Sequence, residues 1–147
     1  DLPTARFVLF EGPTGAGINR ETLEHDGAAA LKIVVAGMLA MRVVSAFIQC
    51  CHLLLSNDSG LMLTAATCRV PCVAVFGPTN PVCMRPWKTG CEIVSRQLRF
   101  MRCFYHSSRP LRCVAGINDA CLREISVDEV FAAVQNQLNA NPIAASC

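Results

Sequence analysis

The sequence predicts an α/β fold in which helices cover both faces of a parallel sheet. Short apolar runs alternate with segments of helical period along most of the chain, and turn-forming residues follow each run. The clearest example is Leu53–Pro81, where one apolar run ends at Ser56–Gly60 and a second ends at Gly77 and Pro78. Because a parallel connection must cross the sheet, this alternation indicates β-α-β units with right-handed crossovers, arranged in three layers.

Length and composition are those of one globular domain, 1–147. The chain has 147 residues, of which 52% are hydrophobic, and this is enough material for a core. The net charge of +2 is too small to indicate a nucleic-acid partner. No apolar run reaches the roughly 18 residues of a membrane span, and the first residues lack the pattern of a signal peptide. We therefore expect a soluble, cytoplasmic protein.

The first part of the chain holds two predicted strands and one helix. Arg6–Phe10 and Leu31–Ala36 are rich in β-forming residues, and both are expected to be strands. A helix is expected between them over Asn19–Ala29, with Glu21 in its first turn. The glycine-rich Gly12–Gly17 lacks the Gly-Lys-Ser/Thr ending of a phosphate loop, and we interpret it as a turn.

The middle of the chain continues the alternation. Met38–Cys51 has the period of an amphipathic helix, with an apolar face made of Leu39, Val43, Phe47 and Cys50. A helix that follows Gly60 is expected between the first two of three strands, which are Leu53–Leu55, Cys72–Phe76 and Cys91–Val94.

The last part begins with an irregular, basic, cysteine-containing loop over 95–123. No Asp or Glu occurs between Ile93 and Asn118, where several arginines gather, and a loop of this length is often functional. A closing helix is expected over 126–138, because Ser126 and Glu129 have the spacing of a capping box. Its apolar stripe is predicted to hold Val127, Val130, Val134 and Leu138.

The ten cysteines are expected to be reduced thiols, since no export signal accompanies them. Cysteine acts as a small hydrophobe in the apolar patterns that hold Cys50, Cys51, Cys68 and Cys72. The close spacing and fourth ligand of a zinc site are missing from Cys103, Cys113 and Cys121. We expect no metal, and a metal or redox module on these three cysteines is the distant alternative.

Polar residues follow two neighbouring strands of the predicted sheet. The first turn is Asp58, Ser59 and Gly60, and the second is Gly77, Pro78 and Thr79. Ligands of open parallel sheets bind outside the carboxyl ends of the strands, and the helix after the first turn offers unpaired N–H groups to a phosphate. Asp58 suits a sugar hydroxyl, and the Thr79 hydroxyl suits an anionic group. In the alternative interpretation, Asp58 and Ser59 only cap the helix.

These segments carry a resemblance to a known family. SNDSGLM, VPCVAVFGPTNP, RPW and CLREISVDEVFAAV resemble the carboxyl-terminal domain of the ADP-heptose:lipopolysaccharide heptosyltransferases, which are GT-B glycosyltransferases. The likeness runs from about Arg6 to Leu138. It implies a Rossmann-like domain that forms the nucleotide-sugar-binding half of a GT-B fold. The first strand of that domain is absent from this sequence, so Arg6–Phe10 would be its second strand.

The resemblance also implies a reaction and partners. The donor is an ADP-sugar, ADP-heptose in the family, and the acceptor is a lipid-linked lipopolysaccharide core oligosaccharide. Transfer inverts the anomeric carbon and needs neither a metal nor a cofactor. An amino-terminal domain binds the acceptor and supplies the catalytic base, so no catalytic residue is assigned in this chain, which would be a poor catalyst alone. Peripheral contact with the inner face of the inner membrane is implied as well.

Site residues carry over by position. The donor-binding set is Asp58, Ser59, Gly60, Gly77, Pro78, Thr79 and Leu39, the last of which would pack near the base. Arg102 and Arg109 in the basic loop are candidate contacts for acceptor phosphates, with a solvated neutral loop as the alternative. The sequence departs from the family where Leu63 replaces a usual His, Met84 and Arg85 replace a Thr-Gly pair, and Phe100 replaces the first Cys of a Cys-x-x-Cys pair. These departures imply donor binding that is weakened or altered in preference. Leu63, together with the absence of the catalytic half, favours the rival function, a non-catalytic nucleotide-binding or interaction domain.

Overall fold

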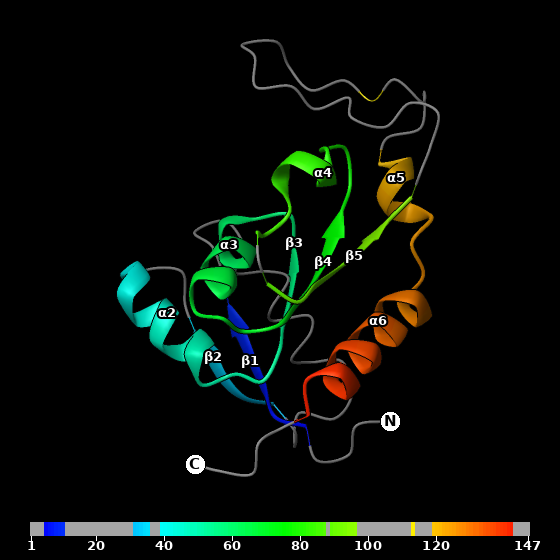
Figure 1. Ribbon diagram of the computed structural model, residues 1–147. Coiled ribbons are helices and arrows are strands. Elements are labelled where there is room, and N and C mark those ends of the chain that lie inside the picture. The colour runs from blue at the N-terminus through cyan, green and yellow to red at the C-terminus, as the bar shows by residue number, and fades with distance from the viewer. Residues whose placement is uncertain are drawn as a thin grey trace. The chain divides into compact units, whose positions relative to one another are not determined.

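The computed structural model describes residues 5–10, 31–35, 39–87, 89–96, 113 and 119–142, and Figure 1 shows the elements that they form. They belong to two compact units, Asp1–Val44 and Ser45–Cys147, and each is described by itself. The predicted helix Asn19–Ala29, the Gly12–Gly17 turn and most of the basic loop lie outside the described residues.

The first unit contains a pair of parallel strands. Strand β1 (Phe7–Phe10) pairs with β2 (Leu31–Val35), which confirms the two strands predicted for this part of the chain. The register shifts by one residue between Phe7 and Val8. The two strands are separated by more than the dozen residues that a parallel connection needs.

Helix α2 (Met41–Gln49) lies within the predicted Met38–Cys51 segment but buries a different face from the predicted one. Val44 and Ile48 are its buried side chains, whereas Leu39, Val43 and Cys50 are exposed and Phe47 is half-buried. Two apolar stripes of i, i+4 spacing overlap in this segment, and both satisfy the helical period. Tertiary packing selects the stripe of Val44 and Ile48, so the predicted apolar face is wrong.

The second unit is built on a three-stranded parallel sheet. Its strands β3 (Leu54–Asn57), β4 (Cys72–Phe76) and β5 (Cys91–Ser95) are ordered β3-β4-β5. Helix α3 (Gly60–Thr67) packs on β3 and β4, and helix α6 (Val127–Ala140) packs on β4 and β5. The sheet confirms the predicted α/β fold with parallel strands.

The central strand β4 forms the core. Side chains alternate between the two faces of a strand, and consecutive residues of β4 (Cys72, Val73 and Ala74) are fully buried, as is Phe76. Both faces of β4 are therefore covered, as expected for a parallel sheet between helices. Burying one large apolar side chain such as Phe76 stabilises the folded state by roughly 1.5–3 kcal/mol.

One of the cysteines with a buried-type pattern lies in this core, and another is exposed. Cys72 is buried as predicted and lies opposite Cys91, which is also buried. A hydrogen bond from the Cys72 thiol to Cys91, together with burial, raises the pKa of Cys72. Cys50 is exposed, contrary to its buried-type pattern, because it follows the last residue of α2. Among the described residues, the free thiols include Cys50, Cys51, Cys68, Cys72, Cys83 and Cys91.

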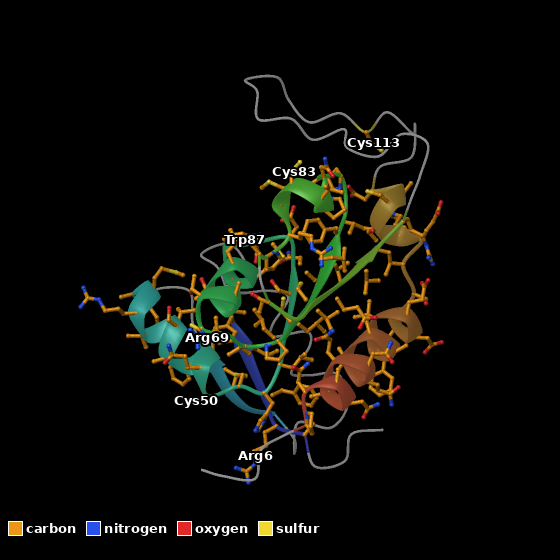
Figure 2. The ribbon with its side chains drawn as sticks, viewed as in Figure 1. Arg6, Cys50, Arg69, Cys83, Trp87 and Cys113 are labelled. Atoms are coloured by element: carbon orange, nitrogen blue, oxygen red, sulfur yellow. The ribbon has the colours of Figure 1, made fainter. Side chains whose placement is uncertain are left out.

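Helix α3 ends in a left-handed residue that is not glycine. Arg69 has φ of 60°, its N–H donates to Ala66 O at 3.1 Å, and the N–H of Val70 donates to Ala65 O at 2.9 Å. This pair of bonds is a Schellman motif, which places glycine at the Arg69 position in most helices. Val70 and Ala65 are both buried, so packing holds the turn closed. Figure 2 labels Arg69 at this end of α3.

Helix α6 begins with the predicted capping box. The Ser126 side chain accepts from the N–H of Glu129, and the Glu129 carboxylate accepts from the N–H of Ser126. Arg96, just after β5, donates to Glu129 Oε2 at 2.5 Å and to Glu124 O at 2.9 Å. Val127 is 84% exposed, so its predicted place in the apolar stripe is wrong, because it lies in the first turn.

Two short helices were not predicted. Helix α4 (Pro81–Met84) follows β4, and helix α5 (Ala120–Arg123) lies inside the segment expected to be irregular. Each has a single turn, which is too short for a hydrophobic period to appear in the sequence. No helix in the described part of the chain is long and apolar enough to cross a membrane.

Replacing Arg69 by glycine is expected to stabilise the protein. A left-handed conformation costs an L-residue about 1 kcal/mol, and glycine avoids this cost. R69G should raise the unfolding free energy by up to about 1 kcal/mol in urea denaturation. The variant R69A keeps a Cβ atom and should give no such gain. An equal gain in both variants would show that loss of the charged side chain, and not backbone conformation, is responsible.

The Glu129 carboxylate is expected to make stability depend on pH in the acid range. Hydrogen bonds from the Ser126 backbone N–H, and then from Arg96 and the Ser126 hydroxyl, lower the pKa of Glu129 from 4.5 to about 2. Since the folded state holds the charged form more strongly, this stabilisation is complete above about pH 4.5 and is lost as the pH falls through about 2. The unfolding free energies of the wild type and of E129Q, measured by urea denaturation, should therefore differ near pH 6 and converge near about pH 2.

The matched control is E124Q, because Glu124 contacts Arg96 through its backbone carbonyl and not through its carboxylate. E124Q should follow the wild-type dependence on pH. If E129Q and E124Q show the same profile, the capping box is not the source of the acid sensitivity.

Candidate functional site

The two predicted turns lie at one edge of the sheet in the second unit. Strands β3 and β4 are parallel and in register, with Asn57 opposite Val75, so their carboxyl ends are neighbours. The first turn (Asp58–Gly60) directly follows β3, and the second turn (Gly77–Thr79) directly follows β4. Figure 1 shows both strands pointing toward the edge where α4 lies. The structure therefore brings together six of the seven predicted donor-binding residues.

Asp58 joins the two turns. Its backbone N–H donates to Val75 O at 3.1 Å, which extends the ladder between the strands by one residue. Its carboxylate Oδ2 accepts a hydrogen bond from the Thr79 hydroxyl. Both side chains are half-buried. The predicted site residues on the two turns are thus in direct contact across 21 positions of sequence.

Ser59 occupies the N-cap position of α3 without capping it. Its side chain makes no capping hydrogen bond and lies 3.0 Å from the Ser56 hydroxyl oxygen instead. The Ser56 hydroxyl donates to Asn57 O at 2.8 Å, and because a hydroxyl has one hydrogen, Ser59 is the donor in the contact with Ser56. With Asp58 bonded to Thr79, neither predicted capping residue of the first turn caps α3. The N–H of Met62 donates to Ser59 O at 3.2 Å, and within the described part of the chain neither of these two side chains occupies the N–H groups at the helix start.

Gly60 leaves open space in front of this helix start. A Cβ atom built on Gly60 would meet nothing within 4 Å, and Gly60 is the first residue of α3. Neither packing nor a left-handed backbone demands glycine there, and alanine favours a helix over glycine by up to about 1 kcal/mol, the value for a helix interior. The missing side chain exposes the backbone to whatever approaches from outside, as a ligand-binding turn requires.

The second turn is held by packing and by a cap. A Cβ atom on Gly77 would lie 3.0 Å from Leu122 Cγ of α5, so glycine lets α5 pack closely on this turn. Asn80 caps α4, since its Oδ1 accepts from the N–H of Val82 at 3.1 Å. Its Nδ2 also donates to the sulfur of Cys83 at 3.3 Å, and Figure 2 labels this cysteine on α4. Thr79 therefore lies in a constrained turn.

Other predicted residues lie away from this edge or outside the description. Leu39 is exposed and belongs to the first unit, and its place near the base stays a prediction. Leu63, which replaces the family's usual His, is 48% exposed on α3. Arg102 and Arg109 lie outside the described residues. Within the described ranges, no group of three His, Cys, Asp or Glu side chains gathers to hold a metal ion.

Sequence reasoning did not predict the roles of three residues in the site. Ser56 binds the Ser59 hydroxyl, Asn80 caps the helix after the second turn, and Leu122 covers Gly77. The Asn-Pro pair that follows Thr79 was a usable signal, because Asn at a cap and Pro at the first helical position is a common helix start. Nothing in the local sequence marks Leu122, which reaches the turn through the fold.

The arrangement suits binding. It offers an uncapped helix start, which attracts an anion such as a phosphate, and beside it a carboxylate, which accepts hydrogen bonds from hydroxyl groups. Asp58 is the one ionisable side chain of the two turns. A ligand that carries both phosphate and hydroxyl groups matches this pair of features.

The chain matches a family model and a curated relative. The model of glycosyltransferase family 9 (heptosyltransferase) matches residues 6–113. Lipooligosaccharide heptosyltransferase 2 of Campylobacter jejuni is 30% identical over 89 residues, which are 60% of this chain and 26% of the relative. The chain thus spans about a quarter of the length of this relative.

Two solved structures share the fold. A family 9 glycosyl transferase of Veillonella parvula has a TM-score of 0.72 and 24% identity, over 92% of this chain and 37% of its own. The ADP-heptose lps heptosyltransferase II of E. coli has a TM-score of 0.70 and 21% identity, with the same coverage of both chains. These likenesses confirm the predicted resemblance to GT-B glycosyltransferase structures.

The two glycines are expected to respond differently to alanine. G60A should leave the unfolding free energy unchanged or raise it by up to about 1 kcal/mol, because alanine favours a helix and the space is open. G77A should lower it by roughly 1 kcal/mol or more, because the new Cβ must displace Leu122. Urea denaturation of the two variants checks this, and equal responses would mean that α5 does not hold the second turn.

Proposed function

The chain belongs to glycosyltransferase family 9 (heptosyltransferase), and from this we propose that its two turns bind an ADP-sugar donor, with ADP-heptose as the first candidate. The observation that carries the proposal is the bridge between Thr79 and Asp58 beside an uncapped helix start. This bridge sets a hydroxyl-accepting carboxylate next to a phosphate-binding backbone. A nucleoside diphosphate sugar presents both of these chemical groups in one molecule.

Each residue of the first turn has a proposed role. The N–H groups at the start of α3 hold the diphosphate, and the open face of Gly60 lets it approach the backbone. Asp58 accepts a hydrogen bond from a sugar hydroxyl, because its negative charge is repelled by phosphate. Gly77 and Pro78 shape the second turn, and Leu39 is proposed to pack near the base.

The proposed reaction is inverting, metal-independent transfer of the sugar to a lipid-linked lipopolysaccharide core acceptor. The 147 residues form the single donor-binding domain in this proposal. In this proposal an amino-terminal acceptor-binding domain of the whole enzyme supplies the catalytic base. Arg102 and Arg109 are proposed to contact acceptor phosphates. The setting is cytoplasmic, with peripheral contact at the inner face of the inner membrane.

A second candidate function has one observation in its favour. Leu63 presents an exposed apolar side chain on α3, at a position where the family usually has a His. A non-catalytic nucleotide-binding or interaction domain derived from the same fold would tolerate this change. Sugar transfer from an ADP-sugar by this chain together with an acceptor-binding domain would discard that candidate, and nucleotide binding without transfer would favour it.

Isothermal titration tests the proposed donor site. The whole chain should bind ADP and ADP-heptose with dissociation constants below about 1 mM, which corresponds to about −4 kcal/mol. G60A should weaken both ligands about tenfold or more, because a Cβ atom enters the space where the diphosphate approaches the backbone.

The matched control is G90A. A Cβ atom on Gly90 would lie 3.5 Å from Gln137 Oε1, an ordinary contact, and Gly90 precedes β5, at the opposite end of the sheet from the two turns. G90A should bind both ligands as the wild type does. No heat of binding at millimolar ligand, from folded wild-type protein, would overturn the proposed site.

A further inference from the structure

We propose that Thr79 is a positioning residue, whose hydroxyl holds the Asp58 carboxylate in the orientation that accepts a hydrogen bond from a sugar hydroxyl of the bound donor. The inference rests on the proposed function and assigns Thr79 a role different from direct contact with an anion. The hydroxyl belongs to either the ribose or the transferred sugar, since both carry the same chemistry next to the diphosphate.

The contact itself shows how the carboxylate is fixed. The backbone of Asp58 is anchored by its N–H bond to Val75 O, but its side chain has two rotatable bonds in a turn. The Thr79 hydroxyl donates to Oδ2, and this bond selects one orientation. Among the described residues, Thr79 is the one side chain that donates to this carboxylate. The lone pairs of Oδ1 are left for a ligand.

Thr79 is suited to this task because it moves little. It is β-branched, which restricts χ1, and Pro78 precedes it with a fixed φ angle. After it, Asn80 is tied to the start of α4 by the bond from Val82. The hydroxyl is therefore presented from a stiff turn to a flexible carboxylate.

The side-chain hydroxyl hydrogens at this edge of the sheet already form hydrogen bonds within the protein. The Thr79 hydroxyl donates to Asp58, the Ser59 hydroxyl donates to Ser56, and the Ser56 hydroxyl donates to Asn57 O. The side-chain hydroxyls of both turns thus donate their single hydrogen to other groups of the protein. The oxygen lone pairs of these hydroxyls remain available to a ligand as acceptors. A lone pair can accept a hydrogen bond from a sugar hydroxyl, whereas a phosphate also offers acceptors and does not match. This polarity supports a positioning role for Thr79 over phosphate binding.

The test uses the whole chain and two ligands, ADP-heptose and ADP, in isothermal titration. T79V keeps the branched shape and removes the hydroxyl, and it should raise the dissociation constant of ADP-heptose about tenfold. T79S keeps a hydroxyl and should stay within about twofold of the wild type. A loss confined to ADP-heptose assigns the transferred sugar, and an equal loss with ADP assigns the ribose.

A double-mutant cycle separates positioning from other roles. D58N should weaken binding about tenfold or more, and D58N/T79V should be no weaker than D58N within about twofold, because Thr79 acts through Asp58. The control T67V removes another threonine hydroxyl, one that donates to Thr64 O within α3, and it should leave both affinities unchanged. Urea denaturation of each variant verifies that it is folded.

The outcomes are distinct. Wild-type affinity in T79V, additive losses in D58N/T79V, or failure of T79S to restore binding would each overturn the positioning role while the proposed donor site stands. Wild-type protein that binds neither ligand would overturn the proposed function, and this inference with it.

Discussion

The parallel, in-register pairing of β3 with β4 is the constraint on which the site depends. It brings Asp58 beside the carboxyl end of β4, where its N–H donates to Val75 O. The covering of β4 on both faces makes this pairing rigid, since Val73, Ala74 and Phe76 are fully buried in the centre of the second unit. The contact between Thr79 and Asp58 is a consequence of that geometry. A one-residue slip of the register would reverse the side chains of β3 and separate the two turns.

The bond between Thr79 and Asp58 explains why the first turn does not behave as an ordinary helix cap. A carboxylate at a helix start usually accepts from the helix's own N–H groups, which would satisfy the helix and close it to ligands. Here the second turn takes the carboxylate, and Ser56 takes the Ser59 hydroxyl. The helix start is left open by side chains that have other partners, and preorganisation of this kind lowers the cost of binding.

The features that were predicted correctly from the sequence are those that depend on residues close together in the chain. Cys72–Phe76 is a strand with the predicted bounds, since it is an unbroken apolar run between Pro71 and Gly77. The capping box of Ser126 and Glu129 could be predicted because its two residues lie three positions apart in the sequence, and it is present in the structure. The buried face of α2 was not predictable, because two apolar stripes fit one helical period and only the fold selects Val44 and Ile48. In the same way, the partner of Asp58 lies on another element, where local pattern gives no information.

At each end of α3 one residue departs from the usual preference for its position. Packing explains the departure at one end, and a role in the candidate site is the explanation that we favour at the other. Arg69 adopts a left-handed conformation in which glycine would cost less, and the buried Val70 beside it supplies a reason within the fold. Gly60 is the opposite exception, a glycine where alanine would favour the helix. The fold supplies no reason for it, because the space in front of it is open. Exceptions that the folded chain does not explain are expected at functional sites, and this one faces the same edge as Asp58 and Thr79. This open space supports the proposal that a ligand approaches the backbone of α3 where a side chain would stand.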